Sequence, residues 1–101
     1  MNVLHIKYAL EVAKAGSLNK ASEKLLIAVP NLSRSIQELE ADIGITIFER
    51  TTKGMCLTAE GEEFVHLAKG IIGQIDSVGR HYKDRTPNKQ KFSISVPRAS
   101  Y

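Results

Sequence analysis

Cysteine and long apolar runs are almost absent from this sequence, and each absence excludes a class of protein. Cys56 is the single cysteine, so no disulfide can form within the chain and a disulfide-stapled secreted domain is not expected. No apolar run approaches the roughly 20 residues that a membrane-spanning helix requires. Lys7, Glu11 and Lys14 interrupt the first segment, which therefore lacks the uncharged core of a signal peptide. We expect a cytoplasmic protein without a membrane partner.

A strong charge of one sign is also lacking. The 101 residues include 14 Lys and Arg against 11 Asp and Glu, a net charge of +3, and the two signs are interspersed. Nucleic-acid binding would therefore depend on where individual cations are placed, and not on a general positive field. With 43% hydrophobic and 25% charged residues, the chain is typical of one small globular domain. Such a domain has a modest core, and a long element that leaves this core needs a partner.

The residue patterns of enzymes and metal sites are missing. The sequence has no Gly-rich phosphate loop, no paired carboxylates of pocket type and no nucleophile with a base. His5, His66 and His81 do not have metal-ligand spacing. Cys56 has no resolving partner, so we interpret it as a small apolar residue and not as a redox sensor. We expect no enzymatic activity, no cofactor and no metal.

The apolar spacing over residues 1–44 predicts three helices. The first covers 3–15 and ends at Gly16; Ser17 caps the second, over 18–26; the third begins at Pro30 and ends at Gly44. The side chains expected to face the core are those of Leu4, Tyr8, Val12 and Ala13 in the first helix, Leu18, Ala21, Ser22 and Leu25 in the second, and Leu32, Ile36, Leu39 and Ile43 in the third.

The pattern then changes to a hairpin and a long helix. Residues 45–48 and 55–57 are short apolar runs of strand type, and the turn between them holds Lys53 and Gly54 at its tip. Thr58, followed by acidic residues, caps a helix over 59–82. Apolar residues in that helix recur with heptad spacing, which predicts a dimerisation seam. The seam consists of Phe64, Ala68, Ile71, Ile75, Val78 and Tyr82.

The last residues predict a hinge and the start of another domain. Residues 84–91 are polar, and Phe92–Val96 alternate as a strand does, with no remaining segment to pair with. We therefore expect a winged helix-turn-helix domain over 1–58, a linker and dimerisation helix over 59–83, a hinge over 84–91, and over 92–101 the first strand of a second domain. The fold class is mainly α.

The order of three helices followed by a hairpin matches a winged helix-turn-helix. In this fold the second helix braces the third, whose N-terminal part can enter a DNA major groove about 12 Å wide, while the hairpin reaches the flanking backbone or minor groove. Four polar residues of the third helix lie off its core stripe and can bond to base edges or phosphates. They are Asn31, Ser33, Arg34 and Gln37.

The chain resembles the amino-terminal region of LysR-type transcriptional regulators over about residues 1–95. The matching motifs are Tyr8–Ala13, Gly16–Leu18, Ala21–Leu25, Leu32–Ile36, Leu39–Glu40, Phe48–Arg50 and Leu57–Gly61. The resemblance implies base reading by Val29, Pro30, Ser33 and Arg34, and a minor-groove role for Lys53. It implies that Ser17, Arg50 and Thr51 are phosphate-side or structural. It also implies an antiparallel homodimer through the long helix, possibly a tetramer in the full-length protein, and a small-molecule effector that binds only to a following domain.

Two departures from the family pattern bear on DNA recognition. Ala28-Val29 stands where the family usually has Ser-Gln before the proline, and a valine can contact only the thymine methyl group at a base edge. Gln37 and Glu38 occupy positions that are often basic in the family. The base preference and the affinity are therefore expected to differ from those usual in the family.

Simpler interpretations remain open for several of these residues. Arg34 and Lys53 can be solvated charges, and Ser17 can be a helix cap. Arg50 can pair with Glu49 or Glu40 instead of a phosphate. The heptad stripe can be the core of a larger monomer. Rival functions are a complete small winged-helix repressor and a protein-binding module with a coiled coil, which would lack salt-dependent affinity for duplex DNA.

Overall fold

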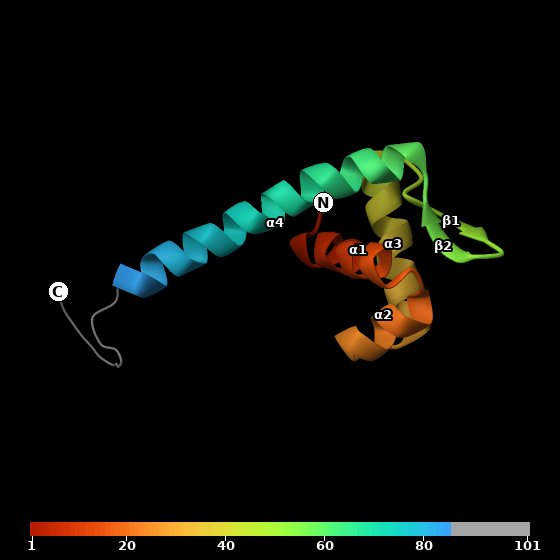
Figure 1. Cartoon of the computed structure of the whole chain (residues 1–101), viewed down its shortest axis with the longest axis horizontal. Helices are drawn as coiled ribbons and strands as arrows, with labels where there is room; N and C mark the ends of the chain where they lie inside the picture. The colour runs from red at the N-terminus through yellow and green to blue at the C-terminus, as the bar shows by residue number, and fades with distance from the viewer. Residues whose placement is uncertain (86–101) are drawn as a thin grey trace.

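A computed structural model describes residues 1–85, which form four helices and a two-stranded sheet (Figure 1). The elements are α1 (Val3–Ala15), α2 (Leu18–Leu25), α3 (Val29–Ile43), β1 (Phe48–Thr51), β2 (Gly54–Leu57) and α4 (Ala59–Arg85). α4 continues two residues beyond its expected end at 83. The rest of the predicted hinge and the strand expected over 92–101 lie outside the described residues. Among residues 1–85, no helix is both long and apolar enough to cross a membrane.

Local sequence signals set the ends of the first three helices. The Asn2 side chain accepts a hydrogen bond from the Leu4 N–H at 2.8 Å and begins α1. Ser17 Oγ accepts from the Lys20 N–H at 3.3 Å and caps α2, as predicted. α1 and α3 end at Gly16 and Gly44, both with positive φ angles, also as predicted. α3 begins one residue earlier than expected, with Pro30 in its first turn.

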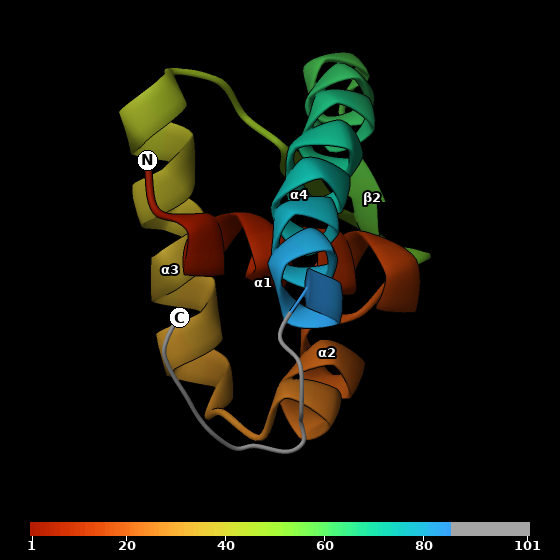
Figure 2. The same ribbon diagram turned by 90° about the vertical axis from the view of Figure 1, so that its left-hand side faces the viewer.

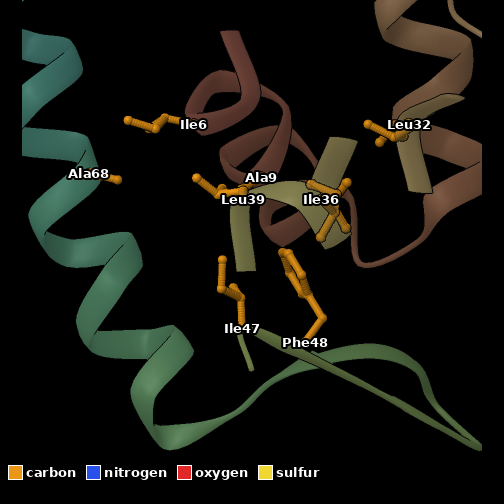
Figure 3. Packing of buried hydrophobic residues seen from close by; sticks show 10 residues of the cluster. Ile6, Ala9, Leu32, Ile36, Leu39, Ile47, Phe48 and Ala68 are labelled. Carbon is orange, nitrogen blue, oxygen red and sulfur yellow. The ribbon is translucent and has the colours of Figure 1, made fainter. Parts of the chain in front are cut away.

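The three helices, the loop before β1 and the first turns of α4 share one core (Figure 3). Fully enclosed side chains include Val12, Leu32, Leu39 and Ile47. The prediction for α2 and α3 is confirmed for Ala21, Ser22, Leu32, Ile36 and Leu39, which are buried. The other three predicted residues, Leu18, Leu25 and Ile43, are partly buried against the same core. Burying these apolar side chains contributes roughly 25 cal/mol for each Å² removed from water.

The predicted core face of α1 was partly wrong. Leu4 is 50% exposed and Tyr8 is only half-buried, whereas Ile6 and Ala9 are buried beside Val12. The buried face of the helix consists of Ile6, Ala9 and Val12, which are spaced three residues apart. Tyr8 packs at the edge of that face, whereas Leu4 points largely away from it, because α1 has apolar residues on more than one side.

The first strand begins later than predicted. β1 starts at Phe48, not at 45, and pairs antiparallel with β2 in a register that places Phe48 opposite Leu57 and Thr51 opposite Gly54. The preceding residues form a loop held by the carboxylate of Glu40. Its Oε2 accepts hydrogen bonds from the N–H groups of Ile47 at 2.7 Å and Phe48 at 3.3 Å. Ile47 is buried from this loop and not from a strand.

Thr58 and Gly61 join the hairpin to α4. Thr58 Oγ1 donates to the Thr46 carbonyl and accepts from the Gly61 N–H at 2.8 Å, so it caps α4 and fixes the loop before β1. A Cβ atom at Gly61 would lie 2.1 Å from the Ile47 carbonyl oxygen. The first turn of α4 can therefore approach this loop only because residue 61 is glycine.

Candidate nucleic-acid interface

α2, a short turn and the start of α3 form the helix-turn-helix unit. The turn is closed by Leu26, which ends α2 in a left-handed conformation with φ +61°, and by the Ile27 N–H, which donates to the Ser22 carbonyl at 3.1 Å. Beyond the turn, Pro30, Asn31 and Arg34 are exposed on the first turns of α3. The N-terminal part of α3 thus has a free face that carries polar and cationic groups.

The hairpin encloses a hollow of about 320 Å³ with the starts of α2 and α3. Ser17 comes from the cap of α2, Val29 from the first turn of α3, and Arg50 and Thr51 from β1. These four residues are distant in sequence, and all four were predicted to contact DNA. Their convergence on one concave surface is a property of the fold.

A second hollow of about 200 Å³ adjoins the first along α3. Ser33, Gln37 and Arg50 line it, and Leu18, Arg50 and Met55 line both hollows. Six of the ten predicted DNA-binding residues therefore lie on one continuous surface. Pro30, Asn31, Arg34 and Lys53 do not line the hollows and stand exposed around them.

Arg50 lies where the two hollows meet. It forms no ion pair with any residue of the described range 1–85. The suggested pairing with Glu49 or Glu40 is therefore wrong, and the Glu40 carboxylate instead accepts hydrogen bonds from the backbone before β1. The exposed guanidinium of Arg50 is free to meet an anion.

Arg34 in α3 and Lys53 in the hairpin turn are two further exposed cationic groups. The Arg34 guanidinium donates to Asn31 Oδ1 at 3.3 Å, which orients it along the exposed face of α3. Lys53 stands at the hairpin turn, where its N–H donates to Thr51 Oγ1 at 3.1 Å. Thr51 therefore shapes the turn, consistent with the structural part of its expected role.

The hairpin is fixed relative to the helices. The Met55 N–H donates to the Gly16 carbonyl at 3.3 Å, and a Cβ atom at Gly54 would lie 2.8 Å from the same oxygen. Gly54 has φ +110°, a conformation that side chains of L-residues rarely adopt. This contact holds the wing against the turn between α1 and α2, so Lys53 is presented at a set position.

Two polar residues of the larger hollow were not predicted from the sequence. Asn19 and Thr52 both border the larger hollow. Asn19 could have been found, since it is polar and two residues beyond the cap of α2, away from that helix's apolar face. Thr52 follows Thr51 in the predicted turn, and no sequence pattern distinguished it from an ordinary turn residue.

The predicted dimerisation seam divides into two parts along α4. Phe64 is half-buried and Ala68 is fully buried within their own subunit, where Ala68 lies near Ile6 (Figure 3). The remaining four positions are exposed: Ile71 by 43%, Ile75 by 40%, Val78 by 57% and Tyr82 by 60%. α4 extends away from the helical domain beyond this division (Figure 1).

These elements define a winged helix-turn-helix protein with a long helix after its wing. The family described as the bacterial regulatory helix-turn-helix protein, lysR family, matches residues 3–62. The chain therefore belongs to the LysR family.

Known relatives are transcriptional regulators. The uncharacterized HTH-type transcriptional regulator YcgK of Bacillus subtilis is 38% identical over 98 residues, which are 96% of this chain and 30% of that protein. The regulator BenM of Acinetobacter baylyi is 37% identical over 78 residues, 77% of this chain and 26% of BenM. This chain thus spans less than a third of the length of either relative.

A solved structure of the BenM DNA-binding domain in complex with benA site 1 DNA is similar to this fold. The two superpose with a TM-score of 0.80 at 35% sequence identity, over 85% of this chain and 100% of that one. A crystal structure of CbnR, a LysR family transcriptional regulator, superposes with a TM-score of 0.79 at 34% identity, over 82% of this chain and 29% of that one.

Proposed function

We propose that this chain binds double-stranded DNA in a sequence-specific manner as part of a transcriptional regulator. The observation that carries the proposal is the convergence of the predicted residues on one surface of a fold whose solved relative is in complex with DNA. α3 would lie in the major groove and the wing would reach the adjacent minor groove. DNA binding involves no chemical reaction, and we infer that the chain is not an enzyme.

Different parts of the surface would make different contacts with DNA. Val29, Pro30, Ser33 and Arg34 face the bases from the start of α3, with Asn31 and Gln37 on the same helix. Ser17, Arg50 and Thr51 contact phosphates, and Lys53 enters the minor groove. Phosphate contacts fix the register of the protein on the duplex, whereas base contacts select the sequence.

We further propose that two copies pair through the exposed part of α4, which presents Ile71, Ile75 and Val78 to solvent in a single chain. Helices with heptad-spaced apolar residues bury them by pairing. Residues 1–58 would then be the DNA-binding domain and 59–83 the dimerisation helix. Because α4 continues to Arg85, a hinge would begin after it and lead to an effector-binding domain beginning at 92, and the regulator would act in the cytoplasm on the nucleoid.

Two alanine variants test the division of roles at the DNA surface. Arg34→Ala should cost about 1–3 kcal/mol on the preferred site and relax the preference at one position of each half-site. Lys53→Ala should weaken binding to most sequences and reduce the dependence of affinity on salt. Lys14→Ala is the matched control, because Lys14 is an exposed cation that lines a different groove, between α1 and α4. Fluorescence anisotropy with specific and scrambled duplexes at several salt concentrations measures all three.

Equal losses for Arg34→Ala and Lys53→Ala on every sequence would contradict the proposed roles. A wild-type chain with no salt-dependent affinity for any duplex would instead favour the protein-binding module.

A further inference from the structure

A groove between α1 and α4 lies apart from the candidate DNA surface. Its volume is about 760 Å³, and none of the residues that line it lines either hollow beside the wing. Figure 2, which views α4 nearly end-on, shows α3 on one side of this helix and the end of α1 on the other. The floor of the groove is apolar and consists of Leu10, Ala13, Leu25, Leu57, Val65 and Ile72.

The floor of this groove is apolar surface that the chain itself does not cover. Val65 is buried, but the other five side chains are only partly buried and pack against the core from one side. Their open side faces the groove. A continuous apolar surface with polar residues at its border is typical of a site that binds another protein.

The border of the groove carries unpaired positive charge. Lys7 and Lys14 stand on α1 and Lys69 on α4, and all three are exposed. None of them forms an ion pair with another residue of the described range 1–85. Glu11, the one carboxylate among the lining residues in this range, is already paired with Lys24 at 3.4 Å. The groove therefore presents uncompensated lysines around an apolar floor.

Both walls of the groove are helix faces. On α1 the lining positions include 7, 10, 11 and 14, and on α4 they are 65, 69 and 72. Each set follows one side of its helix for two turns, roughly 10 Å. Two such rows of side chains leave a channel that fits a third helix, because the side chains of that helix pack between the rows.

The charge of the groove excludes the nearby segments of this chain as its occupant. Residues 77–85, the end of α4, carry three cations against one carboxylate, and residues 86–101 carry three cations and no Asp or Glu. A copy of either segment would bring its cations against the lysines, and like charges that meet across an interface oppose binding. Duplex DNA has the complementary charge, but its polar phosphate backbone would leave the apolar floor without a partner.

We propose that the groove between α1 and α4 docks an acidic amphipathic helix of another protein. The apolar side of that helix would cover the floor around Leu10 and Ile72. Carboxylates on its two flanks would meet Lys7 and Lys14 on one wall and Lys69 on the other. The apolar contact would supply most of the affinity, whereas the exposed ion pairs would select the partner and speed its association.

The docked protein and DNA would bind the same chain at the same time. The two surfaces share no lining residue, and Lys7, Lys14 and Lys69 have no part in the proposed DNA contacts. A regulator bound to its DNA site would thereby hold a second protein beside the duplex. This site adds protein recruitment to the proposed function, and the two can fail separately.

A peptide selection tests which chemistry the groove binds. The chain is immobilised and offered displayed peptides of about 18 residues, designed to form helices and randomised with equal frequencies of acidic and basic residues. Peptides that also bind the variant carrying Lys14→Glu and Lys69→Glu are removed, because they bind elsewhere on the molecule. We expect enrichment of peptides with apolar residues at i, i+3 or i+4, and i+7, flanked by Asp and Glu.

Reversal of single charges should separate docking from DNA binding. Lys69→Glu should lower the affinity for an enriched peptide roughly tenfold and leave the affinity for duplex DNA unchanged. Lys53→Glu is the matched control, because Lys53 is an equally exposed lysine that does not line the groove; it should weaken DNA binding and leave peptide binding unchanged. Fluorescence anisotropy at about 0.15 M salt, where the Debye length is about 8 Å, measures both affinities. Thermal unfolding checks that both variants keep the fold.

Other outcomes would overturn the docking site. Enrichment of basic or uncharged peptides, or no enrichment above the removed background, would exclude an acidic helix as the occupant. A loss of DNA affinity in Lys69→Glu as large as in Lys53→Glu would make the groove part of the DNA surface, and a loss of self-association would make it a contact between copies. Release of the bound peptide by duplex DNA would contradict simultaneous binding. A parent chain that binds the peptides but no DNA would contradict the proposed function and leave the docking site standing.

Discussion

At the scale of single residues, two positions explain the Leu-Thr-x-x-Gly motif that follows the wing. Thr58 caps α4 while its hydroxyl holds the loop before β1, and Gly61 allows the helix to approach that loop. Neither residue lines the candidate DNA surface. The motif is therefore explained by the fold, because it joins the wing, the core loop and α4 at one point.

Replacement of Gly61 by alanine should destabilise the domain strongly. The new methyl group would lie 2.1 Å from the Ile47 carbonyl oxygen, which is backbone and cannot rotate away. We expect a loss of roughly 3 kcal/mol, at the upper end of overpacking costs, because the start of α4 must move. Thermal and urea unfolding at fixed protein concentration measure it.

Gly70→Ala is the control for this prediction. Nothing lies within 4 Å of a Cβ atom built at Gly70, which is exposed in the same helix. Alanine should stabilise the helix there by up to about 1 kcal/mol. The same sign of effect at both glycines would show that helix propensity, and not the approach to Ile47, decides the requirement for Gly61.

The sequence identified most single residues of the candidate surface, and physical reasons explain the exceptions. Polar residues off the apolar stripe of α3 could be recognised from helical periodicity alone. The convergence of Ser17 and Arg50 on the same hollow could not be predicted from the sequence, because it depends on how the wing packs against the turn after α1. The resemblance to a family supplied their roles, and the geometry supplies the reason they lie together.

At the scale of elements, the helices were predictable and the wing was only partly so. Gly16 and Gly44 each follow the last apolar residue of a helical period, which predicts a helix end, and the structure confirms both. The run Ile45-Thr46-Ile47 has strand composition but forms a loop, because Glu40 supplies hydrogen-bond acceptors to its end. A carboxylate seven residues earlier is a tertiary contact that local propensity does not contain.

The turn between α2 and α3 contains a residue that is poorly suited to its backbone. Leu26 has φ +61° and its side chain is 89% exposed, so it bears the strain of the left-handed conformation without gaining burial. Asparagine tolerates this conformation better. Leu26→Asn should therefore raise the free energy of unfolding by about 0.5–1 kcal/mol.

Leu26→Ala separates the backbone effect from the removal of an exposed apolar side chain. Alanine keeps the Cβ atom that makes the left-handed region unfavourable. The unfolding midpoint of the Leu26→Ala variant should therefore stay near that of the parent chain. If alanine stabilised the domain as much as asparagine, the strain at position 26 would not be the cause.

At the scale of the whole molecule, α4 carries more apolar surface than one chain can cover. Its first turns complete the core of the helical domain, whereas Ile71, Ile75 and Val78 remain exposed. An isolated helix with glycines at 70, 73 and 79 should also fray. Pairing of two copies would address both problems, as we propose above.

Charged residues in the seam should separate the two copies. Replacing both Ile71 and Ile75 by aspartate places four carboxylates at the centre of the proposed interface, where desolvation and repulsion oppose association. We expect monomers in sedimentation velocity and a sharp loss of affinity for a two-fold site. Aspartates at the exposed residues His66 and Ser77 together provide the control with the same added charge on the face of α4 opposite the seam, and a stable dimer of the seam variant would contradict the assignment.

The central claim is that two copies of this chain read DNA through α3, and the most direct measurement is a binding selection on duplexes with a randomised central region at one fixed salt concentration. The account predicts enrichment of two half-sites related by a dyad, with a preference for a T·A pair where the Val29 side chain meets the base edge. Affinity for the selected duplex should fall as salt rises. Failure to enrich any sequence, or enrichment of one half-site without a symmetric partner, would contradict it.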